Sequence, residues 1–271
     1  MEYLLLLFVG LLAGTIGSLV GLGGGIIIVP LLIGLGAVST LQSISPQLAV
    51  GTSMVTVVFT GLSSTLTYVK HKRVDYKVGL ILFAGSGPGS IIGSWANKFL
   101  NPDSFSLYFG LFMISVAILL MVKNKLKPLP LSEKARIRNT FITPEGESFT
   151  YGFQPLPAIL ISFAVGFISG LFGIGGGSLL VPAMILLFAF PPHIAVATSM
   201  FLVFLSAAVS SVTHISLGNV DWLYALILIP GAWFGGRLGA FINTKLSGSA
   251  VVTILRLTLI IAGFRMIIKS F

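Results

Sequence analysis

The chain has 271 residues, of which 55% are hydrophobic and only 8% are charged, and its mean hydropathy is +1.04. A soluble domain carries about 25% charged residues, so this composition excludes a soluble globular protein and indicates that most of the chain lies in lipid. The net charge of +9 does not indicate a nucleic-acid partner, because the cations lie beside apolar runs, where they set the orientation of membrane segments.

Each half of the chain begins with a long apolar stretch that glycines interrupt, at residues 3–36 and 156–189. Three further spans follow in each half, at 46–69, 77–98 and 104–122, and at 193–214, 222–244 and 250–268. The arms of each interrupted stretch, about 15 to 18 residues long, are slightly short for a full crossing at 1.5 Å per residue. We therefore expect an all-α polytopic membrane protein with about 8 to 10 membrane segments, two of them hairpins that turn within the bilayer.

The two halves are copies of one pattern. Gly21-Leu22-Gly23-Gly24-Gly25 and Pro30 correspond to Gly173-Ile174-Gly175-Gly176-Gly177 and Pro182. Further along, Pro46, Thr52, Ser53, Met54, Asp75 and Asn97 correspond to Pro192, Thr198, Ser199, Met200, Asp221 and Asn243. Agreement over such a length indicates an internal duplication, with a first transmembrane repeat at 1–123, a linker at 124–155 and a second repeat at 156–271.

Lysine and arginine predict the orientation. Lys70, Lys72, Arg73 and Lys77 mark the connection after the second span as cytoplasmic, and six basic residues mark the linker likewise. The equivalent connection at 216–221 has no basic residue, as expected if the second repeat is inverted. The sequence thus predicts a multi-pass protein of the plasma (inner) membrane with both termini outside.

A small β-hairpin is expected inside the linker. Residues 138–143 and 148–153 flank the turn-forming Pro144-Glu145-Gly146-Glu147. A plain connector is favoured over a regulatory or partner-binding role.

The two glycine runs are candidates for a binding site, namely Gly23, Gly24 and Gly25 with Gly175, Gly176 and Gly177. Helix-breaking glycines inside a membrane are costly unless the freed backbone groups meet protein, water or ligand. Two inverted broken helices bring unpaired N–H groups and positive dipole ends to the midplane, which predicts an anion site without a formal charge. The alternative is that these glycines only permit tight turns and close packing.

Other polar residues could complete that site. Thr52, Ser53, Thr198, Ser199 and Ser178 supply hydroxyl donors, although such hydroxyls in membrane helices most often bond back to their own helix. Arg237 lies in an apolar span and could bind the substrate, or it could extend its side chain to the interface.

Spaced glycines and histidines have simpler interpretations. The glycines at 85, 89 and 93 and at 231, 235 and 239 recur every four residues, as in helix-packing faces. His193 and His214 lie at predicted span ends and His71 in a basic loop, so interfacial positions are favoured over proton transfer.

What the sequence lacks also limits its function. All seven carboxylates fall in termini or connections, which disfavours a cation pathway and a carboxylate proton relay. There is no cysteine, metal-ligand cluster, Walker A motif or nucleophile elbow. We therefore expect no catalytic residue, no metal and no cofactor, so the protein is not expected to be an enzyme.

The duplicated Gly-x-Gly-Gly-Gly with its prolines, the paired Thr-Ser-Met and the spaced glycines ending at Arg237 resemble the TauE/SafE sulfite exporter family over nearly the whole chain. The resemblance implies a secondary transporter that exports sulfite, an organosulfonate or a similar small anion, with a proton as a candidate coupling ion. It places Gly23–Gly25, Gly175–Gly177, Thr52, Ser53, Thr198 and Ser199 at a central site. A passive anion channel, a transporter of another small anion and a non-transporting accessory subunit remain alternatives, and the sequence leaves open whether the chain forms a homodimer.

Overall fold

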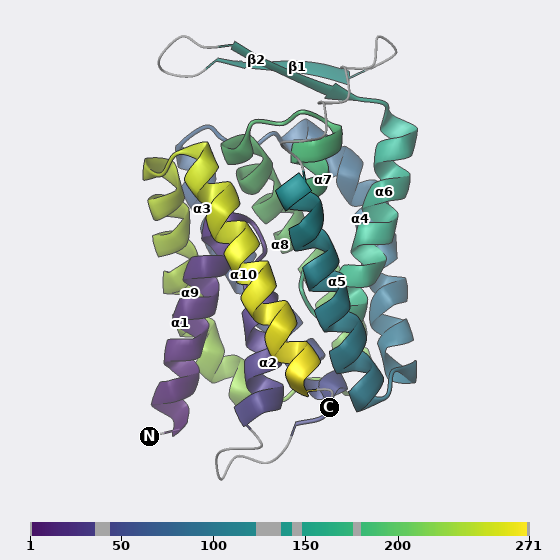
Figure 1. Cartoon of the computed structure of the whole chain (residues 1–271). Coiled ribbons are helices and arrows are strands. Elements are labelled where there is room, and N and C mark those ends of the chain that lie inside the picture. Colours follow the sequence, from purple (N-terminus) through teal and green to yellow (C-terminus); the bar gives the residue numbers. More distant parts are fainter. Residues whose placement is uncertain (1, 36–43, 123–136, 143–147, 176–179, 270–271) are drawn as a thin grey trace.

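The computed structural model describes residues 2–35, 44–122, 137–142, 148–175 and 180–269 (Figure 1). In these segments the first half forms α1 (Glu2–Val20), α2 (Gly25–Leu35), α3 (Pro46–Lys70), α4 (Tyr76–Ala96), the short 3₁₀ turn Asn97–Phe99 and α5 (Pro102–Val122). The second half forms α6 (Pro155–Phe172), α7 (Leu180–Leu187), α8 (Pro192–Ser216), α9 (Trp222–Lys245) and α10 (Gly248–Lys269). Strands β1 (Ile137–Ile142) and β2 (Ser148–Phe153) lie between the halves.

Capping residues fix where several helices begin. Prolines at the first positions of α3 and α8 suit a helix start, because a helix does not need their missing N–H there. Asp75 and Asp221 are the N-caps of α4 and α9, and each accepts a 3.1 Å hydrogen bond from the backbone N–H three residues later. Helices α4 and α9 therefore begin in the same way, each after the connection that follows the buried helix of its half.

Seven of the helices found among the described residues are long and apolar enough to cross a membrane, namely α1, α3, α4, α6, α8, α9 and α10. Helices α2 and α7 are shorter and follow the two glycine runs. Large apolar side chains point outward around the bundle, with Leu4 72% and Ile261 67% exposed, as expected for a surface in contact with lipid. The predicted all-α polytopic fold is confirmed.

Helices α3 and α8 form the centre of the bundle and are mostly buried by the others. Helix α1 packs along α9, and α6 packs along α4, through the spaced glycines. A Cβ on Gly239 would lie 1.9 Å from the carbonyl oxygen of Thr15, and one on Gly93 would lie 2.0 Å from that of Phe167. The predicted packing role of these glycines is confirmed.

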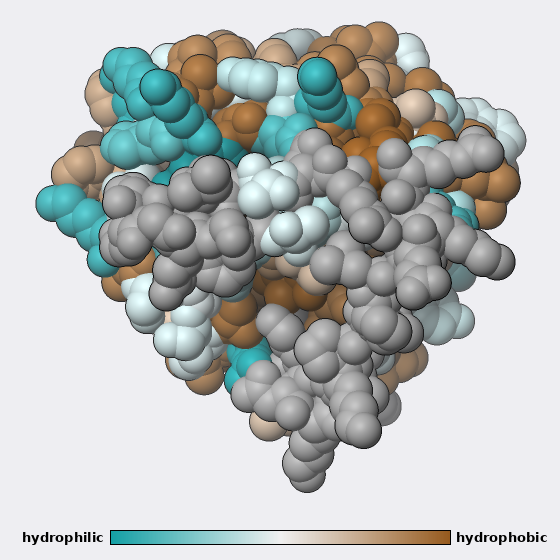
Figure 2. Space-filling view, turned by 90° about the horizontal axis from the view of Figure 1, so that it is seen from above, coloured by the Kyte–Doolittle hydropathy of each residue, from teal (hydrophilic) through white to brown (hydrophobic). Residues whose placement is uncertain are grey.

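The β-hairpin lies across one end of the bundle (Figure 1). Strands β1 and β2 pair antiparallel, with Ile137 opposite Phe153 and Ile142 opposite Ser148. Tyr151 packs on Phe190, with 4.1 Å between ring centroids, so the hairpin is attached to the connection after α7. Figure 2 shows this end from above, where hydrophilic residues lie beside hydrophobic ones at the rim.

Some predictions are not addressed by this architecture. The turn expected at 144–147 and the basic linker residues up to 136 lie outside the described residues. The orientation of each repeat in the membrane also stays a prediction.

Candidate functional site

Both glycine runs reverse the chain where a helix ends. Gly21 and Gly173 have φ of +83° and +76°, in the left-handed region that residues with a Cβ rarely adopt. The backbone N–H groups of Leu22 and Gly23 donate to the carbonyl of Gly17, while those of Gly173 and Ile174 donate to that of Ser169. The first arm of each hairpin therefore ends in a closed turn inside the bundle.

The two turns cross between α3 and α8. A Cβ on Gly25 would lie 2.2 Å from the carbonyl oxygen of Gly173, so backbone meets backbone there. Gly23 and Gly175 both face Val57 and Val203, which are corresponding residues of the two repeats. The structure therefore brings three of the predicted site glycines together at the centre of the protein.

The remaining members of the glycine runs are placed differently. Gly24 packs toward α1, where a Cβ would lie 2.7 Å from the carbonyl oxygen of Ala13. Gly176, Gly177 and Ser178 lie outside the described residues.

Two serines connect each half to the turn of the other half. Ser53 Oγ of α3 donates to the carbonyl of Gly173 at 3.1 Å, and Ser199 Oγ of α8 donates to the carbonyl of Gly21 at 2.9 Å. Both serines are fully buried. These corresponding bonds place two hydroxyl groups at the crossing, one from each repeat.

The threonines beside these serines instead form hydrogen bonds to the connections between α3 and α4 and between α8 and α9. Thr52 Oγ1 accepts from the backbone N–H of Asp221 at 2.9 Å, and Thr198 Oγ1 accepts from that of Asp75 at 3.1 Å. Each threonine thus ties the start of its own helix to the connection of the opposite repeat.

Arg237 lies apart from the crossing. Its side chain is exposed, and its guanidinium carbon lies 5.6 Å from the ring centroid of Trp233, one turn earlier on α9. This position is compatible with an arginine that extends to the interface, and a role in binding substrate stays a prediction.

The sequence profile of the family described as "Sulfite exporter TauE/SafE" matches residues 6–266. The chain belongs to this family. It is 56% identical over 271 residues to the probable membrane transporter protein YunE of Bacillus subtilis, with 100% of this chain and 99% of YunE covered. It is 26% identical over 277 residues to YjnA of the same organism, with 97% and 98% covered.

A more distant similarity is to the probable membrane transporter protein YfcA of Escherichia coli, at 25% identity over 235 residues, with 87% of this chain and 78% of YfcA covered. No solved structure matches the chain. This TauE/SafE protein is thus a multi-pass membrane protein of a transporter family and not an enzyme.

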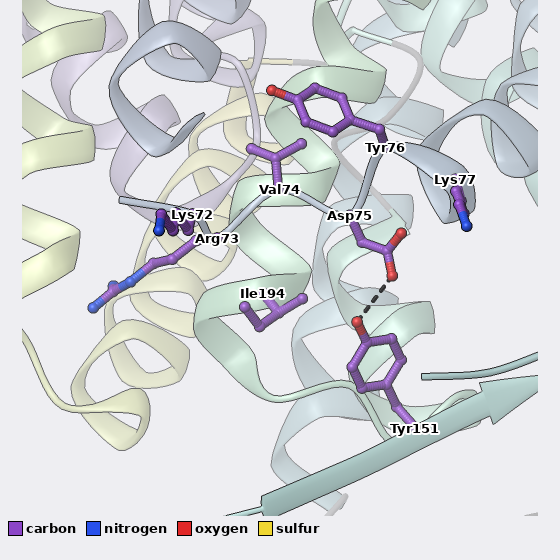
Figure 3. A pocket seen from close by; sticks show the side chains of 8 residues that line it. All are labelled: Lys72, Arg73, Val74, Asp75, Tyr76, Lys77, Tyr151 and Ile194. Carbon is purple, nitrogen blue, oxygen red and sulfur yellow. Dashed lines mark hydrogen bonds between the residues drawn. The ribbon is translucent and has the colours of Figure 1, made fainter. Parts of the chain in front are cut away.

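A cavity of about 390 Å³ lies away from the crossing, beneath the β-hairpin (Figure 3). It is lined by Lys72, Arg73, Val74, Asp75, Tyr76, Lys77, Tyr151 and Ile194. The hydroxyl of Tyr151 donates to Asp75 Oδ2 at 2.9 Å, which fastens β2 to the connection between α3 and α4. Sequence reasoning did not find this cavity, because its walls come from two transmembrane repeats and the linker.

The burial of two ionisable side chains of this TauE/SafE protein was also not predicted from the sequence. His214 is fully buried in the last turn of α8, and its predicted interfacial position stays a prediction. Arg256, inside α10, was not singled out either, and its Nε is buried without a partner among the described residues. An ionisable residue within an apolar span was the available signal in both cases.

Proposed function

We propose that this TauE/SafE protein is a secondary transporter that exports a small sulfur-containing anion, sulfite or an organosulfonate, across the plasma membrane. The two repeats would be inserted in opposite orientations, with the linker in the cytoplasm. The observation that carries the proposal is the crossing of two glycine turns, each held by a serine of the other repeat. Hydroxyl groups inside an apolar bundle suit an oxyanion, which accepts several hydrogen bonds.

Close packing at the crossing favours a transporter over an open channel. Gly23 and Gly175 lie against Val57 and Val203 so tightly that no added Cβ fits without a shift. An anion can therefore reach the turns only when they separate, as in transporters that expose a central site to each side in turn.

The serine hydroxyls can donate hydrogen bonds to the anion once the turns separate. Ser53 and Ser199 now donate to neutral carbonyls, in bonds worth about 1 kcal/mol net. A hydrogen bond to an anionic oxygen is roughly twice as strong, so exchange of the carbonyl for the substrate is favourable.

The test is flux into proteoliposomes. Labelled sulfite, thiosulfate, sulfate and taurine would be compared with and without a pH gradient, for the natural protein and for Ser53→Ala/Ser199→Ala. The matched control is Ser115→Ala/Thr253→Ala, which removes two exposed hydroxyls that only bond back within their own helices. We expect one sulfur anion to accumulate against its gradient, and we expect the loss of both serines to lower that flux by about tenfold or more.

Three outcomes would overturn the proposal. Flux that only follows the electrochemical gradient would indicate a channel, and flux of a small carboxylate alone would indicate another substrate. No flux from correctly folded protein would favour an accessory subunit.

A further inference from the structure

Buried polar atoms without partners gather at one place. Six buried side-chain nitrogen or oxygen atoms in the described part of the chain make no hydrogen bond. Five of them belong to four residues: Asn97 Oδ1, Ser169 Oγ, Ser211 Oγ and both ring nitrogens of His214. Since a buried polar group without a partner costs about 1 to 3 kcal/mol, such a concentration calls for a functional explanation.

Three of these four residues lie at the last turn of α6. Ser169 belongs to that turn, and Asn97 Nδ2 donates to the carbonyl of Leu171 within it at 2.7 Å. The carbonyl of Gly170 lies beside the ring of His214. Ser211 precedes His214 by one turn of α8. The cluster therefore combines the ends of α6, α4 and α8.

The first repeat satisfies the corresponding groups. The register that pairs Thr52 with Thr198 pairs Tyr68 with His214, and Tyr68 donates to the carbonyl of Ser18 at 2.8 Å. Thr65, the counterpart of Ser211, bonds to the carbonyl of Gly61, and the counterpart of Ser169 is Gly17, which has no polar side chain. In the second repeat, therefore, His214, Ser211 and Ser169 have buried polar atoms without a hydrogen bond, whereas at the same positions of the first repeat Tyr68 and Thr65 are bonded and Gly17 has no polar side chain.

Few charges lie around His214. Helix α6 and the start of α3 contain no charged residue. In the connection after α8, Asp221 uses its carboxylate to cap α9, and at the end of α4 the Lys98 ammonium lies 3.8 Å from the Trp95 ring centroid. The Gly170 carbonyl beside the ring is a neutral oxygen, which can accept from an N–H group of an imidazolium.

We propose that His214 is a proton-binding site that couples transport to the pH gradient. The proposal rests on the proposed function and specifies its coupling ion. A proton from water binds the unprotonated ring nitrogen, and the imidazolium then donates to oxygens of the cluster, such as the Gly170 carbonyl.

The site is connected to the crossing of the glycine turns. The backbone N–H of Gly173 donates to the carbonyl of Ser169, and the carbonyl of Gly173 accepts from Ser53. With no acidic residue within a span to balance an imidazolium, an anion at the turns supplies the opposite charge. Proton and anion therefore favour each other's binding, which is the requirement for their movement in the same direction; export then occurs when the outward gradient of the anion exceeds the inward gradient of protons.

The test separates coupling from transport. His214→Gln and His214→Tyr, the second of which restores the residue of the first repeat, would be compared with His71→Gln, which removes an exposed loop histidine. We expect accumulation driven by a pH gradient to fall by about tenfold or more in both His214 variants, while anion counterflow at equal pH falls much less. Unchanged pH-driven accumulation in either folded variant would overturn the proposal.

A second readout does not depend on transport. Imidazole NMR of the protein in detergent would be recorded between about pH 3 and 8, with the His214→Gln spectrum assigning the resonance. We expect the His214 signal to titrate and its midpoint to shift when sulfite is added. A ring that stays in one protonation state throughout would overturn the inference, whereas absence of flux with a titrating ring would count against the proposed function alone.

Discussion

The connection between α3 and α4 lies beneath the β-hairpin, whereas the corresponding connection between α8 and α9 has no such cover among the described residues. Both connections end in an aspartate that caps the next helix and donates its backbone N–H to a threonine of the other repeat. Only Asp75 has the additional bond to Tyr151. The bonds of the aspartates to their helices and to the threonines thus occur in both halves, whereas the bond to Tyr151 comes from the linker.

A second difference lies in how closely each connection packs. A Cβ on Gly51 would lie 1.8 Å from the carbonyl oxygen of Asn219, so the connection after α8 lies directly on the start of α3. The residue that corresponds to Gly51 is Ala197, which shows that the opposite end has room for a methyl group.

The largest expected effect comes from exchanging these two residues. Gly51→Ala should lower the free energy of unfolding by about 3 kcal/mol, because the new methyl overlaps backbone that cannot move aside cheaply. Ala197→Gly should cost about 1 kcal/mol, from helix propensity and lost contact. Thermal unfolding in detergent, followed by the fluorescence of the three tryptophans, measures both. Equal losses would show that the two ends pack alike.

Removing the capping carboxylates should give a smaller difference. Asp75→Ala and Asp221→Ala each lose a cap worth about 1 kcal/mol. Asp75→Ala should lose about 1 kcal/mol more, because the hydrogen bond from Tyr151 to its carboxylate is lost as well. Combining each variant with Tyr151→Phe in double-mutant cycles should show coupling for Asp75 and none for Asp221. Coupling at Asp221 would contradict the assignment of this bond to the linker.

The smallest difference is expected at the threonines. Thr52→Val and Thr198→Val keep the shape of the side chain but remove the acceptor for the N–H of Asp221 or Asp75. Each should lower the free energy of unfolding by about 1 kcal/mol, and by the same amount within about 0.5 kcal/mol, since both bonds belong to the shared core. Unequal losses in urea-dependent unfolding would show that the linker influences the core as well.

The sequence was sufficient for the fold class and for most helices. Long apolar runs, the scarcity of charge and the glycines spaced by four residues depend only on local order along the chain, and so do the proline and aspartate starts of the helices. The repeated Gly-x-Gly-Gly-Gly likewise identified the two turns before their positions in space were known.

The candidate site could be predicted only in part. Three of the glycines, Gly23, Gly25 and Gly175, lie together as the repeated pattern led us to expect, whereas Gly24 packs toward α1. The partners of the hydroxyls could not be predicted, since Ser53 bonds to Gly173 and Thr52 to Asp221, across 120 and 169 positions of the chain. A hydroxyl has no sequence signal that distinguishes a bond to its own helix from one to another repeat.

The sequence by itself therefore determined that the chain spans a membrane, carries one pattern twice and breaks two helices with glycine, because these properties follow from composition and spacing. Only the tertiary structure decided that the turns cross between Val57 and Val203, that Tyr151 fastens the β-hairpin to one end of the bundle and that His214 is buried. The physical reason is that burial and hydrogen-bond partners depend on contacts between distant segments, and these contacts exist only once the two repeats have packed against each other.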